Sequence, residues 1–241
     1  MFDTILAILK FILGPILWGG KLVWGENLPK HGPAIFISNH VDALGPIAIT
    51  CSVPLRMICW MVAEDVDKNL APDYLQKDFI ERQLHFKPPF SRWFSQILSR
   101  VTVPFLNAFG SIPVYHGDAD GIRKTLEMSM VALREEKYIL IFPETPLLPA
   151  DPATKMNPFL DSFARLGDVF YTETGKCLEF YPLTVHPKRY VVVGKPVAFN
   201  PHNPAEQERR RLCDLMETSI KTFYLLPDPG AVAANLAEME I

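Results

Sequence analysis

His40 is the residue with the strongest case for chemistry. It follows an apolar segment, residues 34–38, stands next to Asn39 and opens a turn that contains Gly45. A side chain in such a position faces a cleft more often than a core. A neutral imidazole can take a proton from an attacking hydroxyl near pH 7. We therefore expect His40 to act as a general base. The other histidines lack this context and are expected to be structural, apart from His116.

Two further polar side chains follow apolar segments in the same way. His116 comes after residues 111–115, and Glu144 comes after residues 138–142. Short apolar runs bounded by turn residues are typical of buried strands in a parallel sheet. Ligands collect at the carboxyl ends of such strands. His40, His116 and Glu144 are therefore expected at one edge of a sheet.

The segments around these residues alternate between strand and helix patterns. Strands are expected at 34–38, 55–62, 111–115, 138–142, 177–185 and 190–199, and helices from about 46, within 65–109, at 120–136 and at 206–224. This alternation predicts an α/β fold with a mainly parallel central sheet flanked by helices.

One helical segment, Ser91–Arg100, is amphipathic. It places Trp93, Phe94, Ile97 and Leu98 on one side, with an arginine near each end. Such a face suits either a lipid surface or a protein core, and the sequence favours neither.

Length, charge and cysteine content narrow the class of protein. The chain has 241 residues, of which 49% are hydrophobic, enough for one α/β domain with a substantial core. Its formal net charge of −3 argues against a nucleic-acid partner, because such proteins carry a basic excess. The four cysteines form no CxxC pair and no histidine stands at metal-ligand spacing, so neither a metal nor a disulfide is expected.

The N-terminal segment is apolar from Thr4 to Val23, with only two lysines. Gly14-Pro15 divides it into pieces too short to span the roughly 30 Å of a bilayer's hydrocarbon. We expect residues 1–24 to form short helices in the membrane interface, with Trp18 and Trp24 near the headgroups. The alternative is a helix that caps the core. The expected organisation is this segment, an α/β domain over 25–226, and a flexible tail over 227–241.

Four motifs in register resemble the glycerolipid acyltransferase family, which includes the 1-acylglycerol-3-phosphate acyltransferases. They are Asn39-His40-Val-Asp42-Ala-Leu-Gly45, Gly110-Ser-Ile-Pro-Val-Tyr-His116, Phe142-Pro143-Glu144-Thr145 and Tyr181-Pro182-Leu183. The resemblance extends from about residue 23 to residue 199. It implies a glycerol-phosphate-acyltransferase-like fold.

The sequence departs from the family pattern at three places. Gly45 stands where the family has an aspartate five residues after the histidine, which leaves Asp42 as the nearest carboxylate. Asp42 is either the substitute partner of His40 or only a helix cap. Thr145-Pro146-Leu147 replaces glycine-threonine-arginine, and His116 replaces an arginine. Arg123, Lys124 and Lys155 are candidate replacements for the missing cations.

The resemblance implies an O-acyltransferase of phospholipid biosynthesis. His40, with Asp42, would deprotonate an acceptor hydroxyl that attacks the thioester of an acyl-CoA or acyl carrier protein. The expected substrate-binding residues are Asn39, Gly110, His116, Phe142, Pro143 and Glu144. No metal or cofactor is expected, because a thioester is already activated.

The resemblance also implies a cellular location and a class of binding partner. Membrane lipids are the expected partners, with the chain peripheral or monotopic on the cytoplasmic face of a membrane. The weakened phosphate anchors favour an acceptor less anionic than lysophosphatidate. The alternative is a catalytically silent relative that binds lipid at the membrane surface. The sequence carries no signal for an oligomeric state.

Overall fold

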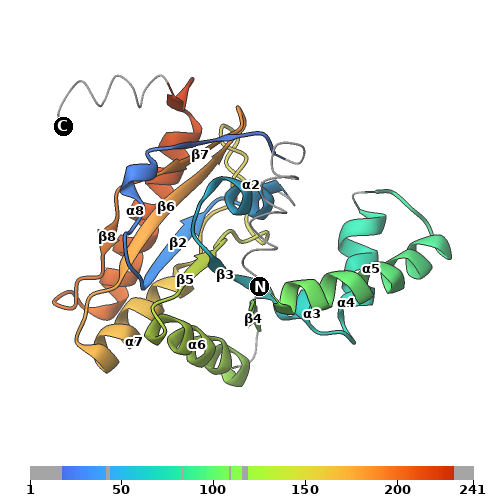
Figure 1. Ribbon diagram of the computed structural model, residues 1–241, viewed down its shortest axis with the longest axis horizontal. Coiled ribbons are helices and arrows are strands. Elements are labelled where there is room, and N and C mark those ends of the chain that lie inside the picture. The colour runs from blue at the N-terminus through green and yellow to red at the C-terminus, as the bar shows by residue number, and fades with distance from the viewer. Residues whose placement is uncertain (1–17, 42–43, 83, 109, 116–118, 231–241) are drawn as a thin grey trace. The chain divides into compact units, whose positions relative to one another are not determined.

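The computed structural model describes residues 18–41, 44–82, 84–108, 110–115 and 119–230 (Figure 1). The chain divides into two compact units. The larger unit draws on Met1–Met57 and Ala132–Ile241, and the smaller unit is Ile58–Val131. The larger unit contains most of the strands, whereas the smaller unit is largely helical.

The larger unit is built on a mainly parallel sheet. Its strands are β1 (Lys21–Val23), β2 (Ala34–Ser38), β5 (Tyr138–Ile141), β6 (Glu179–His186), β7 (Tyr190–Val193) and β8 (Val197–Ala198). Their order is β1-β7-β6-β2-β5, and β8 pairs with β6. The β1–β7, β2–β5 and β2–β6 pairs are parallel, whereas β7 and β8 run antiparallel to β6. The α/β fold predicted from the sequence is confirmed.

Strand β2 forms the centre of the core in this unit. Ala34, Ile35, Phe36 and Ile37 are all 0% exposed, as expected for a parallel strand buried on both faces. Ile37 pairs in register with Ile141 of β5. Because the two strands are parallel, the residues that follow them leave the sheet at the same edge.

In the part of this unit that the structure describes, the sheet is accompanied by helices α2 (Leu44–Ser52), α7 (Arg165–Thr174) and α8 (Ala205–Tyr224) and by the short 3₁₀ turns η1 (Gly25–Asn27) and η3 (Asp161–Ala164). Helix α8 packs along β6 (Figure 1) through Leu212, Met216 and Ile220, which are fully buried. The sequence predicted α2 and α8. It did not predict α7, whose buried face carries only Leu166, Gly167 and Phe170, too few apolar residues to make a pattern.

The smaller unit contains most of strand β3 (Met57–Val62) and of helix α6 (Ala119–Arg134), which extend slightly beyond its limits. Between them lie α3 (Ala63–Val66), α4 (Ala71–Tyr74), the π-helical η2 (Leu75–Glu81), α5 (Phe90–Ala108) and strand β4 (Ile112–Val114). Strands β3 and β4 are parallel. Helix α6 is tied to both, because Thr125 Oγ1 donates to Pro113 O at 2.7 Å and Trp60 Nε1 donates to Ser129 Oγ at 2.9 Å. These elements lie in the ranges that the sequence predicted.

The end of the predicted N-terminal helical segment differs from expectation. Lys21–Val23 is a strand that pairs with β7, not a helix. Trp18 is only 6% exposed, and the Trp24 ring meets Phe223 edge-on at 5.2 Å, so both rings pack against other residues of the larger unit. A three-residue edge strand is too short to show a period within a long apolar run. Residues 1–17 and 231–241 lie outside the described residues, so the boundaries of the N-terminal segment and tail stay predictions.

None of the helices that the structure describes combines the length and apolarity needed to cross a bilayer.

Candidate functional site

His40 and Glu144 meet where two adjacent parallel strands end. Strand β2 leads through Asn39 into His40, and strand β5 leads through Phe142 and Pro143 into Glu144. The His40 backbone N–H donates to Glu144 Oε1 at 2.5 Å. The sequence placed both residues at one sheet edge. It did not indicate that the contact uses the His40 backbone and leaves the imidazole out.

The Glu144 carboxylate joins two loops. Its second oxygen, Oε2, accepts from the backbone N–H of Asn157 at 2.8 Å. Burial raises the pKa of Glu144 above its usual value, and the two N–H donors, from His40 and Asn157, lower it in part. Each carboxylate oxygen has lone pairs for more than one donor. Glu144 therefore holds the backbone of His40 while keeping capacity for a further hydrogen bond.

The His40 side chain is exposed, and its ring lies edge-on to Phe142 with centroids 5.0 Å apart. Gly45 lies close to both His40 and Phe142. A Cβ at position 45 would lie 3.6 Å from Phe142 Cε1 and 3.8 Å from His40 Cα, in ordinary van der Waals contact. A Cβ at position 45, where the family has its aspartate, would thus fit beside the backbone of His40 without a clash.

The Asn39 side chain is used within the sheet. Its Nδ2 donates to Val185 O at 3.1 Å, and its Oδ1 accepts from Val185 N at 2.8 Å. Asn39 is 1% exposed. Its amide therefore pairs with β6 as a backbone amide would, and it fixes the residue before His40.

We expect Asn39→Leu to lower the free energy of unfolding by about 2–4 kcal/mol, because the buried N–H and C=O of Val185 would both lose their partners. Asn39→Asp keeps an acceptor for the Val185 N–H but turns an oxygen toward the Val185 carbonyl, so it should also destabilise. Urea unfolding of each variant measures the change. A loss below about 1 kcal/mol for Asn39→Leu would show that the amide pairing is dispensable.

The loop after Glu144 is tied back onto the strand end. Thr145 N donates to Pro158 O at 3.0 Å, and Leu160 N donates to Pro143 O at 2.9 Å. These bonds bring Asn157 next to Glu144. Leu147, at the position of the family's arginine, is 89% exposed.

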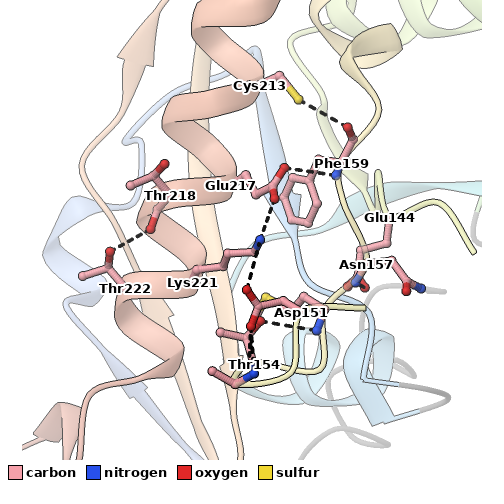
Figure 2. Close-up of polar contacts among 12 residues, drawn as sticks. Glu144, Asp151, Thr154, Asn157, Phe159, Cys213, Glu217, Thr218, Lys221 and Thr222 are labelled. Atoms are coloured by element: carbon pink, nitrogen blue, oxygen red, sulfur yellow. Dashed lines mark hydrogen bonds and ion pairs between the residues drawn. The ribbon is translucent and has the colours of Figure 1, made fainter. Parts of the chain in front are cut away.

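Side chains of helix α8 also bind this loop, as Figure 2 shows. Glu217 Oε2 accepts from the Phe159 N–H at 3.1 Å, and Glu217 Oε1 pairs with Lys221 Nζ at 2.7 Å. Lys221 also lies 3.8 Å from Asp151. Its positive charge offsets a small part of the rise in the pKa of Glu144 that burial causes, whereas the charge of Glu217 adds to that rise. No sequence pattern indicates these contacts, because Glu217 and Phe159 stand 58 positions apart.

An open pocket of about 170 Å³ is lined in part by Val41, the residue after His40. The rest of its lining is Trp18, Val185, His186, Pro187, Arg189 and Tyr224. The cavity therefore offers mostly apolar surface next to the site.

The remaining candidates are placed differently. Gly110 lies in the smaller unit with a positive φ of 79°, a conformation that favours glycine. Asp42 and His116 lie outside the described residues. Lys155 is on the loop that carries Asn157, and it too has a positive φ, of 61°.

The candidate cations of the smaller unit already have neighbours. Arg123 pairs with Glu127 at 2.9 Å, and Lys124 lies over the Tyr115 ring at 5.5 Å. Among the residues that the structure describes, no three His, Cys, Asp or Glu side chains gather as a metal site.

Comparison with known proteins bears on the fold. No protein-family model matches the sequence, and no curated protein matches it. The structure matches the crystal structure of the 1-acyl-sn-glycerophosphate (LPA) acyltransferase PlsC from Thermotoga maritima, with a TM-score of 0.53 and 14% sequence identity. The match covers 94% of this chain and 82% of that chain. The chain has the fold of an LPA acyltransferase.

This likeness confirms the glycerol-phosphate-acyltransferase-like fold that the four sequence motifs imply. It covers nearly the whole chain, so the agreement is not limited to the sheet. At 14% identity the likeness concerns the fold alone.

Proposed function

We propose that this chain is an O-acyltransferase that moves a fatty acyl group from an acyl thioester to a lysophospholipid or a related membrane acceptor. The observation that carries the proposal is the 2.5 Å hydrogen bond between His40 N–H and Glu144, at the ends of adjacent parallel strands in an acyltransferase fold. This bond fixes the backbone of His40, the base in the proposed reaction, to the side chain of the second motif residue, Glu144.

The reaction requires one proton transfer and accurate positioning. The His40 imidazole takes the proton of the acceptor hydroxyl, and the resulting oxygen attacks the thioester carbonyl. The tetrahedral intermediate then collapses, the C–S bond breaks, and the imidazolium returns the proton to the leaving sulfur. Asp42 orients the imidazole and stabilises its charged form.

The surroundings of His40 suit this substrate class. Glu144 holds His40 in place, and its remaining lone pairs accept a hydrogen bond from the acceptor. The apolar cavity beside Val41 is suited to part of an acyl chain. Leu147 replaces the family's arginine, so an acceptor less anionic than lysophosphatidate is preferred.

The direct test is acyl transfer by the purified full chain. Acyl-CoA and acyl carrier protein donors are combined with a panel of lysophospholipids that differ in headgroup charge, and the phospholipid product is measured by mass spectrometry. Turnover on at least one pair supports the proposal. No turnover on any pair, while the protein still binds the lysolipids, would instead establish the silent lipid-binding protein that the glycine at position 45 favours.

A rescue experiment tests the role of Asp42. Asp42→Asn should lower turnover about 10²-fold, in line with the contribution of a group that supports acid–base catalysis. Adding Gly45→Asp should recover at least about tenfold of that loss, because the Cβ at position 45 lies 3.8 Å from His40 Cα. Gly45→Asn in the same background is the matched control and should recover nothing. Equal turnover in both double variants would contradict a carboxylate partner for His40.

A further inference from the structure

Helix α5 of the smaller unit buries its small polar side chains. Ser91, Ser95 and Ser99 follow one another at four-residue spacing and are 0%, 1% and 5% exposed. The Ser95 and Ser99 hydroxyls donate to carbonyls of the helix itself, and Ser91 Oγ donates to Glu81 Oε1 of η2 at 2.7 Å. This face packs on α4 and η2. The inward side of α5 is therefore closely packed although it is not apolar.

The opposite face of α5 exposes its large apolar side chains. Phe90, Trp93, Ile97 and Val101 are 48%, 57%, 41% and 67% exposed. Their spacing of three and four residues aligns them along one side of the helix, and we call them the α5 stripe. Phe86, 40% exposed, extends the stripe with its ring 5.2 Å from that of Phe90. This is the reverse of a soluble amphipathic helix, and contiguous exposed apolar surface marks an interaction site.

The sequence segment that carries the stripe has charges of one sign. Residues 82–115 contain no aspartate or glutamate, and their cations are Arg82, Lys87, Arg92 and Arg100, all exposed. The acidic residues of α3, α4 and η2 lie on the elements that pack against the serine face of α5. Aromatic side chains flanked by cations without acids are typical of a helix that lies on an anionic membrane surface.

We propose that the α5 stripe docks on an anionic lipid bilayer, with Trp93 and Phe90 entering the interface and Arg92 and Arg100 contacting acidic headgroups. A second copy of the chain fits less well, because stripe-to-stripe contact would bring arginines of like charge together. The inference concerns binding and holds whether or not the chain transfers acyl groups. It resolves the choice between lipid and core that the sequence left open for this helix in favour of lipid.

Vesicle binding by the full chain tests the stripe. Phosphatidylcholine vesicles with and without phosphatidylglycerol are sedimented with the protein. The double variant Trp93→Ser/Ile97→Ser should bind the anionic vesicles at least about tenfold more weakly. The control Leu147→Ser/Leu148→Ser removes two apolar side chains of the larger unit that are more exposed, at 89% and 53%, and should bind as the unmodified chain does.

Two further variants test the charge of the arginines and the insertion of Trp93 into the lipid separately. Arg92→Gln/Arg100→Gln should weaken binding to anionic vesicles about fivefold for each cation and leave binding to neutral vesicles unchanged. Arg123→Gln/Lys124→Gln, on α6 of the same unit, is its control. With brominated lipids, Trp93→Phe should lower the quenched fraction of the tryptophan fluorescence while retaining binding.

Three results would overturn the proposal. Unchanged binding by the Trp93→Ser/Ile97→Ser variant would assign any membrane contact to another segment, such as the N-terminal one. Equal quenching with and without Trp93 would show that the stripe stays outside the lipid. Self-association without vesicles that the stripe variant abolishes would make a second copy the partner.

Discussion

His40→Ala should lower kcat for acyl transfer about 10²–10⁴-fold while changing stability by less than about 0.5 kcal/mol. The imidazole is exposed, so its removal leaves no cavity. The backbone N–H of residue 40, which any residue except proline retains, still donates to Glu144. The variant should therefore lose the base and keep the site that held it.

Steady-state kinetics together with urea unfolding separate these effects. His40→Gln keeps hydrogen-bonding capacity but cannot carry the proton, so it should be as inactive as the alanine variant. His202→Ala, at another exposed histidine of the same unit, is the control and should keep full activity. Turnover within a few-fold of the unmodified chain in His40→Ala would contradict the mechanism and leave the acyltransferase activity to another base.

Glu144→Ala should reduce both activity and stability. The carboxylate accepts from His40 N at 2.5 Å and from Asn157 N at 2.8 Å. Its removal leaves two N–H groups without this partner in a partly buried site, which costs about 2–4 kcal/mol. It also frees the backbone of His40, so kcat should fall about 10²-fold or more even though the imidazole remains.

The same two measurements distinguish Glu144 from His40. Glu144→Gln keeps one acceptor oxygen but turns an NH₂ group toward a backbone N–H, so it should recover only part of the lost stability. The control is Glu206→Ala, which removes an exposed glutamate paired with Arg210 and should cost less than about 1 kcal/mol. A Glu144→Ala variant that unfolds at the same urea concentration as the unmodified chain would show that the two N–H bonds do not hold the loops together.

The sequence predicted the main strands and helices because each presents a long enough apolar pattern. Placing His40 and Glu144 at strand ends was enough to predict that they share a sheet edge. The pattern cannot show which atoms meet, so the backbone nature of the His40–Glu144 contact came only from the structure. Asn157, Glu217 and Lys221 reach the site through loop and helix contacts that have no sequence period.

One element was misassigned, and the exposed face of another stayed open, for different physical reasons. Lys21–Val23 follows a long apolar run, and a three-residue edge strand cannot be told from a helix end by pattern. Helix α5 was recognised as amphipathic, but its direction was open, because apolar residues at helical spacing do not say what they face. The buried serines of α5 settle which side meets the rest of the smaller unit.

The grip of Glu144 on a backbone N–H makes residue 40 exchangeable. The hydrogen bond depends on no atom of the histidine side chain, and the Asn39 amide fixes the preceding residue independently of it. The contacts of Glu144 and Asn39 therefore fix the backbone at position 40 whichever side chain that position carries. A cysteine or serine placed there would be presented at the same edge, beside the same apolar cavity. Such a hydroxyl or thiol would need a base from elsewhere in the site to act as a nucleophile, because the substitution removes the imidazole.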